Sequence, residues 1–255
     1  MLATQRQELI AEAVRREGSV RVVELAERFG VSDMTIRRDL ELLAEQERLV
    51  KVHGGATALE GSAAAEPGFA VKSGVLRAEK ERIGRRAAEL VPPGSAVALS
   101  AGTTTWAAAR HLVRVPGLTV VTNSWSVAEV FHAEGGADQT VVLTGGTRTP
   151  SDALVGPIAV AAVASLNVDV LLLGVHGMSV RAGLTTPNLL EAETDRALMA
   201  AARRRIVLAD HTKWGVTGLS TIAPLRDADV LVTDDGLPEE ARADLAAHVG
   251  ELVIV

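Results

Sequence analysis

The stretch Val31-Ser-Asp-Met-Thr-Ile-Arg-Arg-Asp-Leu40 decides the fold of the first part of this chain. Gly30 stands just before it, where a chain can leave a helix with a positive φ, and Ser32 is a favoured N-cap residue. We therefore expect a helix from Asp33 to about Gln46, preceded by a helix from Val22 to Arg28. Two helices joined by a short turn that contains glycine form a helix-turn-helix.

The two faces of the expected third helix differ in chemistry. At about 100° per residue, Ile36, Leu40 and Leu43 fall together and should pack inward. The opposite face and its flanks present Met34, Thr35, Arg37 and Arg38. A helix of this kind places its first turns against base edges in a DNA major groove. The alternative is an arginine pair on a solvated face, but the turn, the cap and the apolar stripe together favour DNA.

Two flanking segments complete a winged helix-turn-helix. An apolar stripe at helical spacing predicts a helix from Gln5 to Arg16, with Thr4 as its N-cap. After the third helix, apolar and basic residues alternate over Val50–His53 and a Gly-Gly turn follows, which predicts a short strand of a wing. Wings contact the DNA backbone or minor groove, so Lys51 and His53 are candidate DNA contacts.

The same residues resemble the DeoR family of bacterial transcriptional regulators. The run Thr35-Ile-Arg-Arg-Asp-Leu40 and the wing-closing Val52-His-Gly-Gly-Ala56 carry the resemblance. Lys51 stands where an arginine is common in the family, which keeps the charge but loses a bidentate fork. The resemblance implies a winged helix that binds operator DNA, with recognition positions at Ser32, Met34, Thr35, Arg37 and Arg38.

Composition limits the remaining possibilities. The chain has 255 residues, no cysteine, 47% hydrophobic and 23% charged residues, which indicates a folded globular protein without disulfides or thiolate metal sites. The net charge of −6 argues against a surface that binds nucleic acid throughout, but it allows a local DNA-binding patch. Residues 1–60 hold nine Lys and Arg against eleven Asp and Glu, so non-specific DNA affinity should be modest and salt-sensitive. Met1–Glu8 shows no secretory signal and no apolar run is long enough for a membrane span, so we expect a cytoplasmic protein.

Patterning divides the chain into two domains and a linker. We expect the winged helix-turn-helix domain at 1–57, a linker at 58–76 rich in small residues, and a second domain at 77–255. In the second domain, apolar runs alternate with helix-like stretches, which predicts a doubly wound, mostly parallel α/β sheet. The expected strands are Ala96–Ser100, Leu118–Thr122, Val141–Thr144, Val170–Gly174, Ile206–Ala209, Val230–Val232 and Leu252–Val255. The expected helices are Lys80–Leu90, Thr103–Leu112, Ser126–Ala133, Val160–Leu166, Leu189–Ala202 and Pro238–His248.

Small polar residues follow several of these strands, and ligands of such sheets bind beyond the carboxyl ends of the strands. The loop Ala101-Gly-Thr-Thr-Thr105 offers hydroxyls beside helix N–H groups, which makes it a ready anion site for a phosphate. Gly145-Gly146 and Lys213 also follow strands. Each has an ordinary alternative, namely a helix start, a tight turn and a surface lysine, but their convergence at strand ends favours a ligand site. Neither a Walker motif nor the dinucleotide glycine spacing is present, which argues against ATP, GTP and NAD.

The DeoR resemblance extends over the second domain. The matching pieces are Lys80, Gly102-Thr-Thr-Thr105, Thr122-Asn-Ser124, Gly145-Gly146, Gly174 to Gly177, and Asp210 with Lys213. It implies a domain similar to ribose-phosphate isomerases that senses phosphorylated sugars, with the threonine loop on the phosphate and Asn123 and Lys213 near the ligand. The candidate effector-binding residues are Gly102, Thr103, Thr104, Thr105, Asn123, Gly145, Gly146, His176 and Lys213. Ser100-Ala101 stands where the family often has an aspartate, a loss that would change hydroxyl recognition or abolish sensing of the usual ligand.

An enzyme of the sugar-phosphate isomerase type with an appended DNA-binding module is the alternative function. Isomerisation needs a positioned general base and usually a second acid. Gly174-Val-His-Gly-Met178, at the place of the acidic loop of the isomerases, has no carboxylate, and a lone His176 is more typical of a structural or ligand-contacting residue. We therefore expect a repressor without catalytic residues, cofactor or metal. Its expected partners are operator DNA, a phosphorylated sugar or polyol effector, and further copies of the chain in a homodimer or homotetramer. A DNA-binding protein that has lost its effector response is a third possibility.

Overall fold

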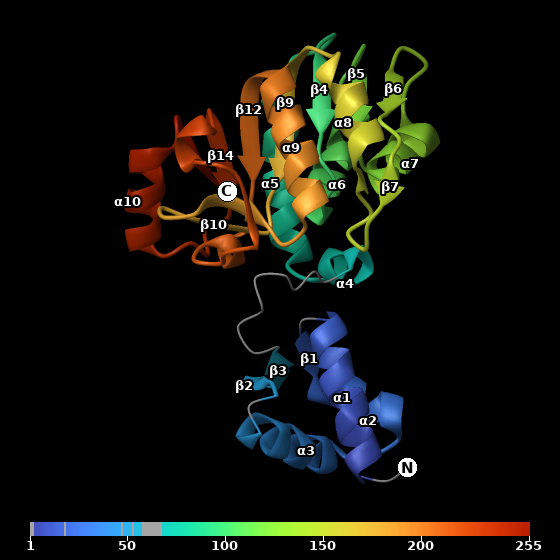
Figure 1. Cartoon of the computed structure of the whole chain (residues 1–255), viewed down its shortest axis with the longest axis vertical. Coiled ribbons are helices and arrows are strands. Elements are labelled where there is room, and N and C mark those ends of the chain that lie inside the picture. The colour runs from blue at the N-terminus through green and yellow to red at the C-terminus, as the bar shows by residue number, and fades with distance from the viewer. Residues whose placement is uncertain (1–2, 18, 47, 53, 58–67) are drawn as a thin grey trace. The chain divides into compact units, whose positions relative to one another are not determined.

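The computed structural model describes residues 3–17, 19–46, 48–52, 54–57 and 68–255. The chain divides into two compact units, Met1–Lys72 and Ser73–Val255 (Figure 1). The linker limits of 58 and 76 stay a prediction, and the described part of that segment contains helix α4 (Phe69–Gly74). Among the described residues, no helix has both the length and the apolar character that a membrane span requires.

The first unit consists of three helices and a small antiparallel sheet. Its helices are α1 (Ala3–Glu17), α2 (Val22–Phe29) and α3 (Asp33–Glu45), and its strands are β1 (Ser19–Arg21), β2 (Val50–Val52) and β3 (Gly55–Thr57). The strands pair in the order β1-β3-β2. The core contains the buried side chains of Ile10, Val14, Leu25, Ile36, Leu40 and Leu43. The winged helix-turn-helix prediction is therefore confirmed, with β1 as a third strand that periodicity did not predict.

Local sequence explains the turn of this motif. Gly30 ends α2 with φ 63° and ψ 40°, the left-handed conformation that glycine adopts without strain. The hydroxyl of Ser32 accepts a hydrogen bond from the backbone N–H of Thr35 at 3.3 Å and so caps α3. The predicted N-cap Thr4 is wrong, because α1 already begins at Ala3. Alanine is the strongest helix former, and water can satisfy the first N–H groups of an exposed helix end.

A seven-stranded parallel sheet forms the centre of the second unit. Its order is β15-β14-β12-β9-β4-β5-β6, and every neighbouring pair is parallel. The strands are β4 (Ala96–Leu99), β5 (Thr119–Thr122), β6 (Thr140–Leu143), β9 (Val168–Gly174), β12 (Ala202–Leu208), β14 (Val230–Thr233) and β15 (Leu252–Ile254). The chain moves from β4 outward to β6 and restarts at β9 on the other side of β4. This reversal confirms the doubly wound sheet and places its switch point between β4 and β9.

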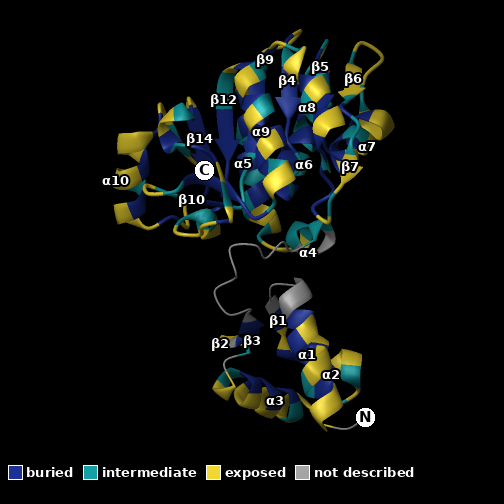
Figure 2. Cartoon of the chain, in the orientation of Figure 1, coloured by how far each residue is buried: buried dark blue, intermediate teal, exposed yellow. Residues whose placement is uncertain are grey.

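Helices cover both faces of this sheet (Figure 1). One face carries α5 (Arg77–Glu89), α6 (Thr103–Leu112) and α7 (Trp125–Glu134), and the other carries α8 (Pro157–Ala164), α9 (Leu189–Ala201) and α10 (Glu239–His248). Strand residues alternate between the two cores, since Val97 and Leu99 pack with the first group of helices and Ala98 with the second. The buried strands between partly exposed helices are visible in Figure 2.

The remaining elements are short and were not predicted. Strands β10 (Gly177–Ser179), β11 (Gly183–Thr186) and β13 (Ser220–Ala223) form an antiparallel sheet, and β7 (Thr147–Arg148) pairs with β8 (Leu154–Val155). Strands of two to four residues contain too few alternations to show a period. The predicted start of α8 at Val160 is three residues late. Pro157 occupies the first helical position, where its missing N–H costs nothing.

Candidate functional site

The exposed face of α3 carries the predicted DNA-reading residues. Met34 is 73% exposed, Ser32, Arg37 and Arg38 are exposed, and Thr35 is half-buried. None of the described residues forms an ion pair with Arg37 or Arg38. Both guanidinium groups are therefore available for base edges or phosphates, while the apolar stripe of the same helix is buried.

A buried ion pair ties α3 to α1. The Nε of Arg6 donates to Oδ2 of Asp39 at 2.6 Å, and Nε2 of Gln7 donates to Oδ1 of Asp39 at 2.8 Å. Arg6 and Asp39 are 8% and 3% exposed. This contact could not be predicted from the sequence, because Asp39 follows two arginines in a charged run and its partners lie more than thirty positions earlier. The side of α3 next to the reading face is thus held by polar contacts.

An ion pair connects the first strand of the wing to α3. Lys51 on β2 is exposed, and its ammonium pairs with the carboxylate of Glu41 on α3. The hydrogen bond and charge of Lys51 hold the pKa of Glu41 below its usual value. A DNA contact by Lys51 therefore has to replace or share this pairing. His53, the other predicted wing contact, lies outside the described residues.

The candidate effector residues lie in the segments that follow strands of the parallel sheet, either in loops or at the start of a helix. Because the strands are parallel, their carboxyl ends meet at the same edge. The loop of Gly102–Thr105 follows β4, Asn123 follows β5, and Gly145-Gly146 follows β6. His176 follows β9 and Lys213 follows β12. The fold therefore places at one edge of the sheet segments that are spread over more than one hundred positions of the sequence, and a shared ligand site stays a prediction.

The threonine loop has the chemistry of an anion site. Gly102 precedes α6, and no side chain caps the first turn of this helix. Thr103 and Thr104 are largely buried, and no described residue bonds to their hydroxyls, whereas the hydroxyl of Thr105 donates to the carbonyl of Gly102 at 2.9 Å. Free N–H groups, two hydroxyls and the positive end of the helix dipole are what a phosphate requires.

Ser100, the first residue after β4, connects the two strands of the switch point. Its backbone N–H donates to the carbonyl of Leu172 at 3.0 Å, and its hydroxyl accepts from the N–H of Gly174 at 2.9 Å. The side chain is 1% exposed. Ser100 therefore serves as a bridge between β4 and β9, and its hydroxyl is already occupied by this role.

Asn123 and Gly146 have clear structural roles at the same edge. Oδ1 of Asn123 accepts from the N–H of Ala101 at 2.9 Å, and its Nδ2 donates to the carbonyl of Leu154 at 3.2 Å. This amide fixes the start of the threonine loop. Gly146 has φ 121°, and a Cβ there would lie 2.5 Å from the carbonyl oxygen of Val155. The glycine is required by the close approach of β8, and contact of either residue with an effector stays a prediction.

The edge also contains two lysines of different character. Lys213, on the short helix His211–Lys213, is half-buried, and no described residue pairs with its ammonium. Lys80 on α5 is 5% exposed, and its Nζ donates to the carbonyl of Val75 at 2.8 Å. Both α5 and α6 run antiparallel to β4, so their first turns lie at the carboxyl edge of the sheet. Two cations at this edge add to its preference for an anion.

A histidine–aspartate pair that the sequence did not predict lies just after the ends of β12 and β14. Nδ1 of His211 lies 2.6 Å from Oδ2 of Asp234, and the backbone N–H of His211 donates to Oδ1 at 2.7 Å. Burial favours a raised pKa for Asp234, but the hydrogen bonds from His211 and Gly236 outweigh it and lower the pKa. The pair joins two loops that no local pattern relates.

Two carboxylates on α9 lie close together. Glu191 accepts hydrogen bonds from the hydroxyls of Thr149 at 2.7 Å and Thr186 at 3.2 Å. Asp195, one turn later, is 8% exposed. Burial and the neighbouring charge of Glu191 raise the pKa of Asp195 well above its usual value. This residue is an energetic cost of the fold at neutral pH, and it has no place in the predicted site.

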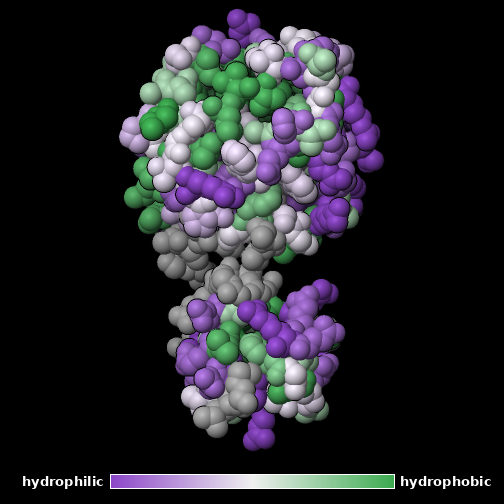
Figure 3. Space-filling model, turned by 90° about the vertical axis from the view of Figure 1, so that its right-hand side faces the viewer, coloured by the Kyte–Doolittle hydropathy of each residue, from purple (hydrophilic) through white to green (hydrophobic). Residues whose placement is uncertain are grey.

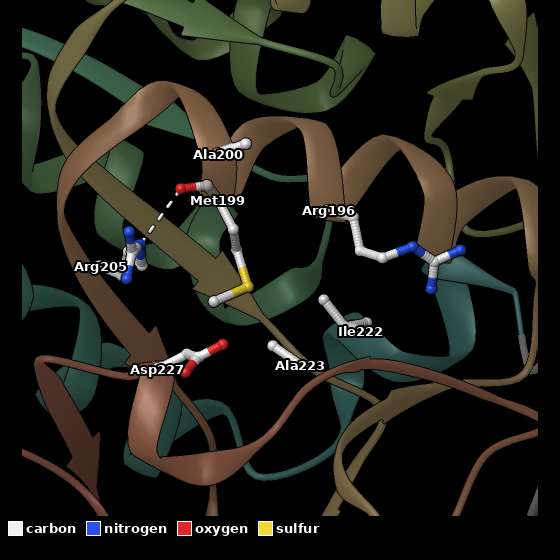
Figure 4. A pocket seen from close by; sticks show the side chains of 7 residues that line it. All are labelled: Arg196, Met199, Ala200, Arg205, Ile222, Ala223 and Asp227. Carbon is white, nitrogen blue, oxygen red and sulfur yellow. Dashed lines mark hydrogen bonds between the residues drawn. The ribbon is translucent and has the colours of Figure 1, made fainter.

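A cavity of about 300 Å³ opens beside α9 (Figure 4). None of the candidate effector residues lines it. The guanidinium groups of Arg196 and Arg205 lie on opposite sides of it. Arg196 donates to the carbonyl of Thr221 at 2.6 Å and Arg205 to that of Met199 at 3.2 Å. Since its cations diverge and are tied to backbone carbonyls, this cavity is a poorer anion site than the threonine loop.

Comparisons with known proteins identify both units. Residues 6–61 match the DeoR-like helix-turn-helix domain, and residues 76–235 match the DeoR C terminal sensor domain. The HTH-type transcriptional regulator YgbI of Escherichia coli K12 is 39% identical over 100% of this chain and 98% of its own. The glycerol-3-phosphate regulon repressor of the same organism is 33% identical over 97% of each chain. The full-length sorbitol operon regulator SorC from Klebsiella pneumoniae aligns over 95% of this chain and 98% of its own, with 16% identity and a TM-score of 0.41.

Proposed function

The chain belongs to the DeoR family of helix-turn-helix transcriptional regulators, and from this membership we propose a repressor of carbohydrate or polyol genes that responds to a phosphorylated metabolite. The observation that carries the proposal is the threonine loop at the switch point of the sheet. Its uncapped helix start and free hydroxyls suit a phosphate dianion. The name of the 33%-identical relative, a glycerol-3-phosphate regulon repressor, supports an effector of this chemical class.

The proposal is tested by ligand binding to the full chain. A thermal-shift panel of sugar and polyol phosphates, each beside its unphosphorylated form, comes first. A ligand present at a hundred times its Kd stabilises the folded state by about 2.7 kcal/mol, which a thermal shift detects readily. Calorimetry then compares the wild type with Thr104→Asp, which places a negative charge where the phosphate would lie. Ligand binding should fall sharply, while DNA binding without ligand should persist.

Thr119→Asp is the matched control for this variant. Thr119 is an exposed residue at the start of β5, and the amino ends of parallel strands lie at the opposite edge from the threonine loop. The control should bind the ligand like the wild type. Equal binding of phosphorylated and unphosphorylated sugars by the wild type would refute the phosphate site. So would normal binding by Thr104→Asp.

We also propose that the chain binds its ligand without converting it. The relatives named above are transcriptional regulators, and the loop of Gly174–Met178 carries no carboxylate. Incubation with ribose 5-phosphate should yield no ketose phosphate. Turnover that the His211→Ala variant loses would favour the enzyme alternative, because His211 is an imidazole oriented by a carboxylate.

We propose a homodimer or homotetramer as the working form. Two DNA half-sites require two recognition helices. The edge strand β6 exposes the apolar side chains of Val141 and Val142, at 37% and 39%. Figure 3 shows hydrophobic side chains gathered over the upper part of the second unit. Sedimentation of the full chain measures the mass directly, and a monomer at the concentrations that bind DNA would contradict this proposal.

A further inference from the structure

A groove of about 480 Å³ lies between α1 and α3 in the DNA-binding unit. From α1 it is lined by Ala3, Arg6 and Gln7, and from α3 by residues that include Ser32, Thr35 and Arg38. The α3 residues are predicted reading positions, so the groove opens beside the face that meets DNA. It was not visible in the sequence, because its two walls lie about thirty positions apart.

The groove contains one cation that is almost completely buried, the guanidinium group of Arg6. The residue is 8% exposed, and only its Nε is engaged, by Asp39. No described residue bonds to its two terminal nitrogens, although the side chain lines the groove. Asp39 also lines it, but its two oxygens accept from Arg6 and Gln7. The negative charge is thus engaged, while donors of the guanidinium remain for a ligand.

The groove is also lined by the apolar residues Ala3, Met34 and Leu42, and its other polar groups include further donors. The first turn of α1 contains no acidic residue, so no carboxylate within it offsets the positive end of the helix dipole. Arg38 is exposed and forms no ion pair among the described residues. The hydroxyls of Ser32 and Thr35 lie 2.9 Å apart at the start of α3. Donors and positive charge on two walls select an oxyanion.

The position of the groove identifies the source of that oxyanion. Packed helices lie about 8–10 Å apart, whereas a major groove is about 12 Å wide. When α3 lies among the bases, a helix packed beside it therefore meets the phosphate backbone at the rim of the groove. We propose that the groove between α1 and α3 binds one backbone phosphate of the operator, held by Arg6, Arg38 and the first turn of α1. This contact carries no base information and fixes the register of α3 on the duplex.

The variant Ala3→Glu tests the proposal without disturbing the core. Residue 3 is exposed and begins α1, where an acidic side chain is favourable for the helix. Its carboxylate would enter the groove and repel a phosphate. The matched control is Gln5→Glu, which adds the same charge to the same turn on an exposed position outside the groove. Each purified full-length variant is titrated with two duplexes of equal length, one selected from random sequence by the wild type and one scrambled.

The expected result follows from counterion release. Each neutralised phosphate contributes about −0.9 to the slope of log K against log salt, which is about a fivefold gain at 0.15 M relative to 1 M. Ala3→Glu should therefore lose about fivefold on both duplexes at 0.15 M salt and show a slope shallower by about one. Gln5→Glu should stay within about twofold, because residue 5 is exposed outside the groove and salt screens the charge of an exposed side chain.

A second variant tests the same phosphate contact without introducing a carboxylate, whose charge could also act on DNA at long range. Arg6→Gln combined with Asp39→Asn removes the cation while keeping an uncharged pair between α1 and α3. It should reproduce the loss on both duplexes, and circular dichroism reports whether the helices are retained. Equal affinities of Ala3→Glu and Gln5→Glu would overturn the proposal. A loss confined to the selected duplex would also overturn it, because that result indicates base reading rather than a phosphate contact.

Discussion

The contact between α5 and α6 gives a sharp prediction for Gly84→Ala. A Cβ at residue 84 would lie 2.7 Å from the backbone nitrogen of Ala108, 2.8 Å from the carbonyl carbon of Ala107 and 3.0 Å from the Cα of Ala108. All three are backbone atoms, so no rotamer change relieves the clash and the helices must separate. Overpacking of this kind costs about 1–3 kcal/mol, and backbone contacts place it near 3. The better helix propensity of alanine returns about 1 kcal/mol. The net loss is about 2 kcal/mol.

Tryptophan fluorescence reports the unfolding of the second unit, where Gly84 lies. All three tryptophans of the chain, Trp106, Trp125 and Trp214, belong to the second unit, so their unfolding signal reports that unit alone. A domain of this size loses about 2–4 °C in Tm per kcal/mol, so Gly84→Ala should melt about 4–8 °C lower.

The control for this experiment is Gly74→Ala. Gly74 is also helical, but nothing lies within 4 Å of its Cβ position. Here only the propensity term acts, so Tm should stay level or rise slightly. If Gly84→Ala also stabilises the second unit, the close crossing of α5 and α6 is absent and the reasoning fails.

Three further predictions concern charged residues. Arg37→Ala and Arg38→Ala should each weaken operator binding at fixed salt, by about 1–3 kcal/mol where a base edge is read, and unchanged affinity in both would remove α3 from the interface. Asp195→Asn should raise Tm at neutral pH, because burial raises the pKa of Asp195 and makes its ionised form costly in the folded state. The gain in Tm should shrink as the pH falls towards 4, and a difference in Tm that does not depend on pH would contradict this prediction. The pKa of Asp234 is lowered in the folded state, so the ionised carboxylate stabilises the fold above about pH 4, and this stabilisation is lost as the pH falls through the lowered pKa. Acid unfolding of Asp234→Asn, followed by tryptophan fluorescence, should lack the loss of stability that this titration causes in the wild type.

Local signals predicted the first unit well. Gly30 and Ser32 each specify a backbone conformation that depends on one residue and its immediate neighbours, and the stripe of Ile36 and Leu40 needs only helical geometry. The Arg6–Asp39 contact depends on how α1 packs against α3, a relation between distant segments that no periodicity encodes. The groove beside it was missed for the same reason.

In the second unit too, local sequence predicted some features, while others depend on contacts between distant segments. Long apolar runs identified the central strands, because a strand buried on both faces has few polar residues. The threonine loop was predicted as an anion site because a glycine and three hydroxyls follow a strand directly, and the structure bears out its place at the start of α6. The hydrogen bonds of Ser100 and Asn123 depend on partners in β9 and β8, so they become visible only in the folded chain.

The hydrogen bond from Lys80 to the carbonyl of Val75 joins α5 to the first residues of the second unit. Leu76 follows directly, a non-glycine residue with φ 50°, and Lys80 lies one turn into α5. We expect that a ligand which drew the Lys80 ammonium towards itself would free the Val75 carbonyl beside this left-handed residue. The start of the second unit would then respond to an event only one helical turn away, without any change across the sheet.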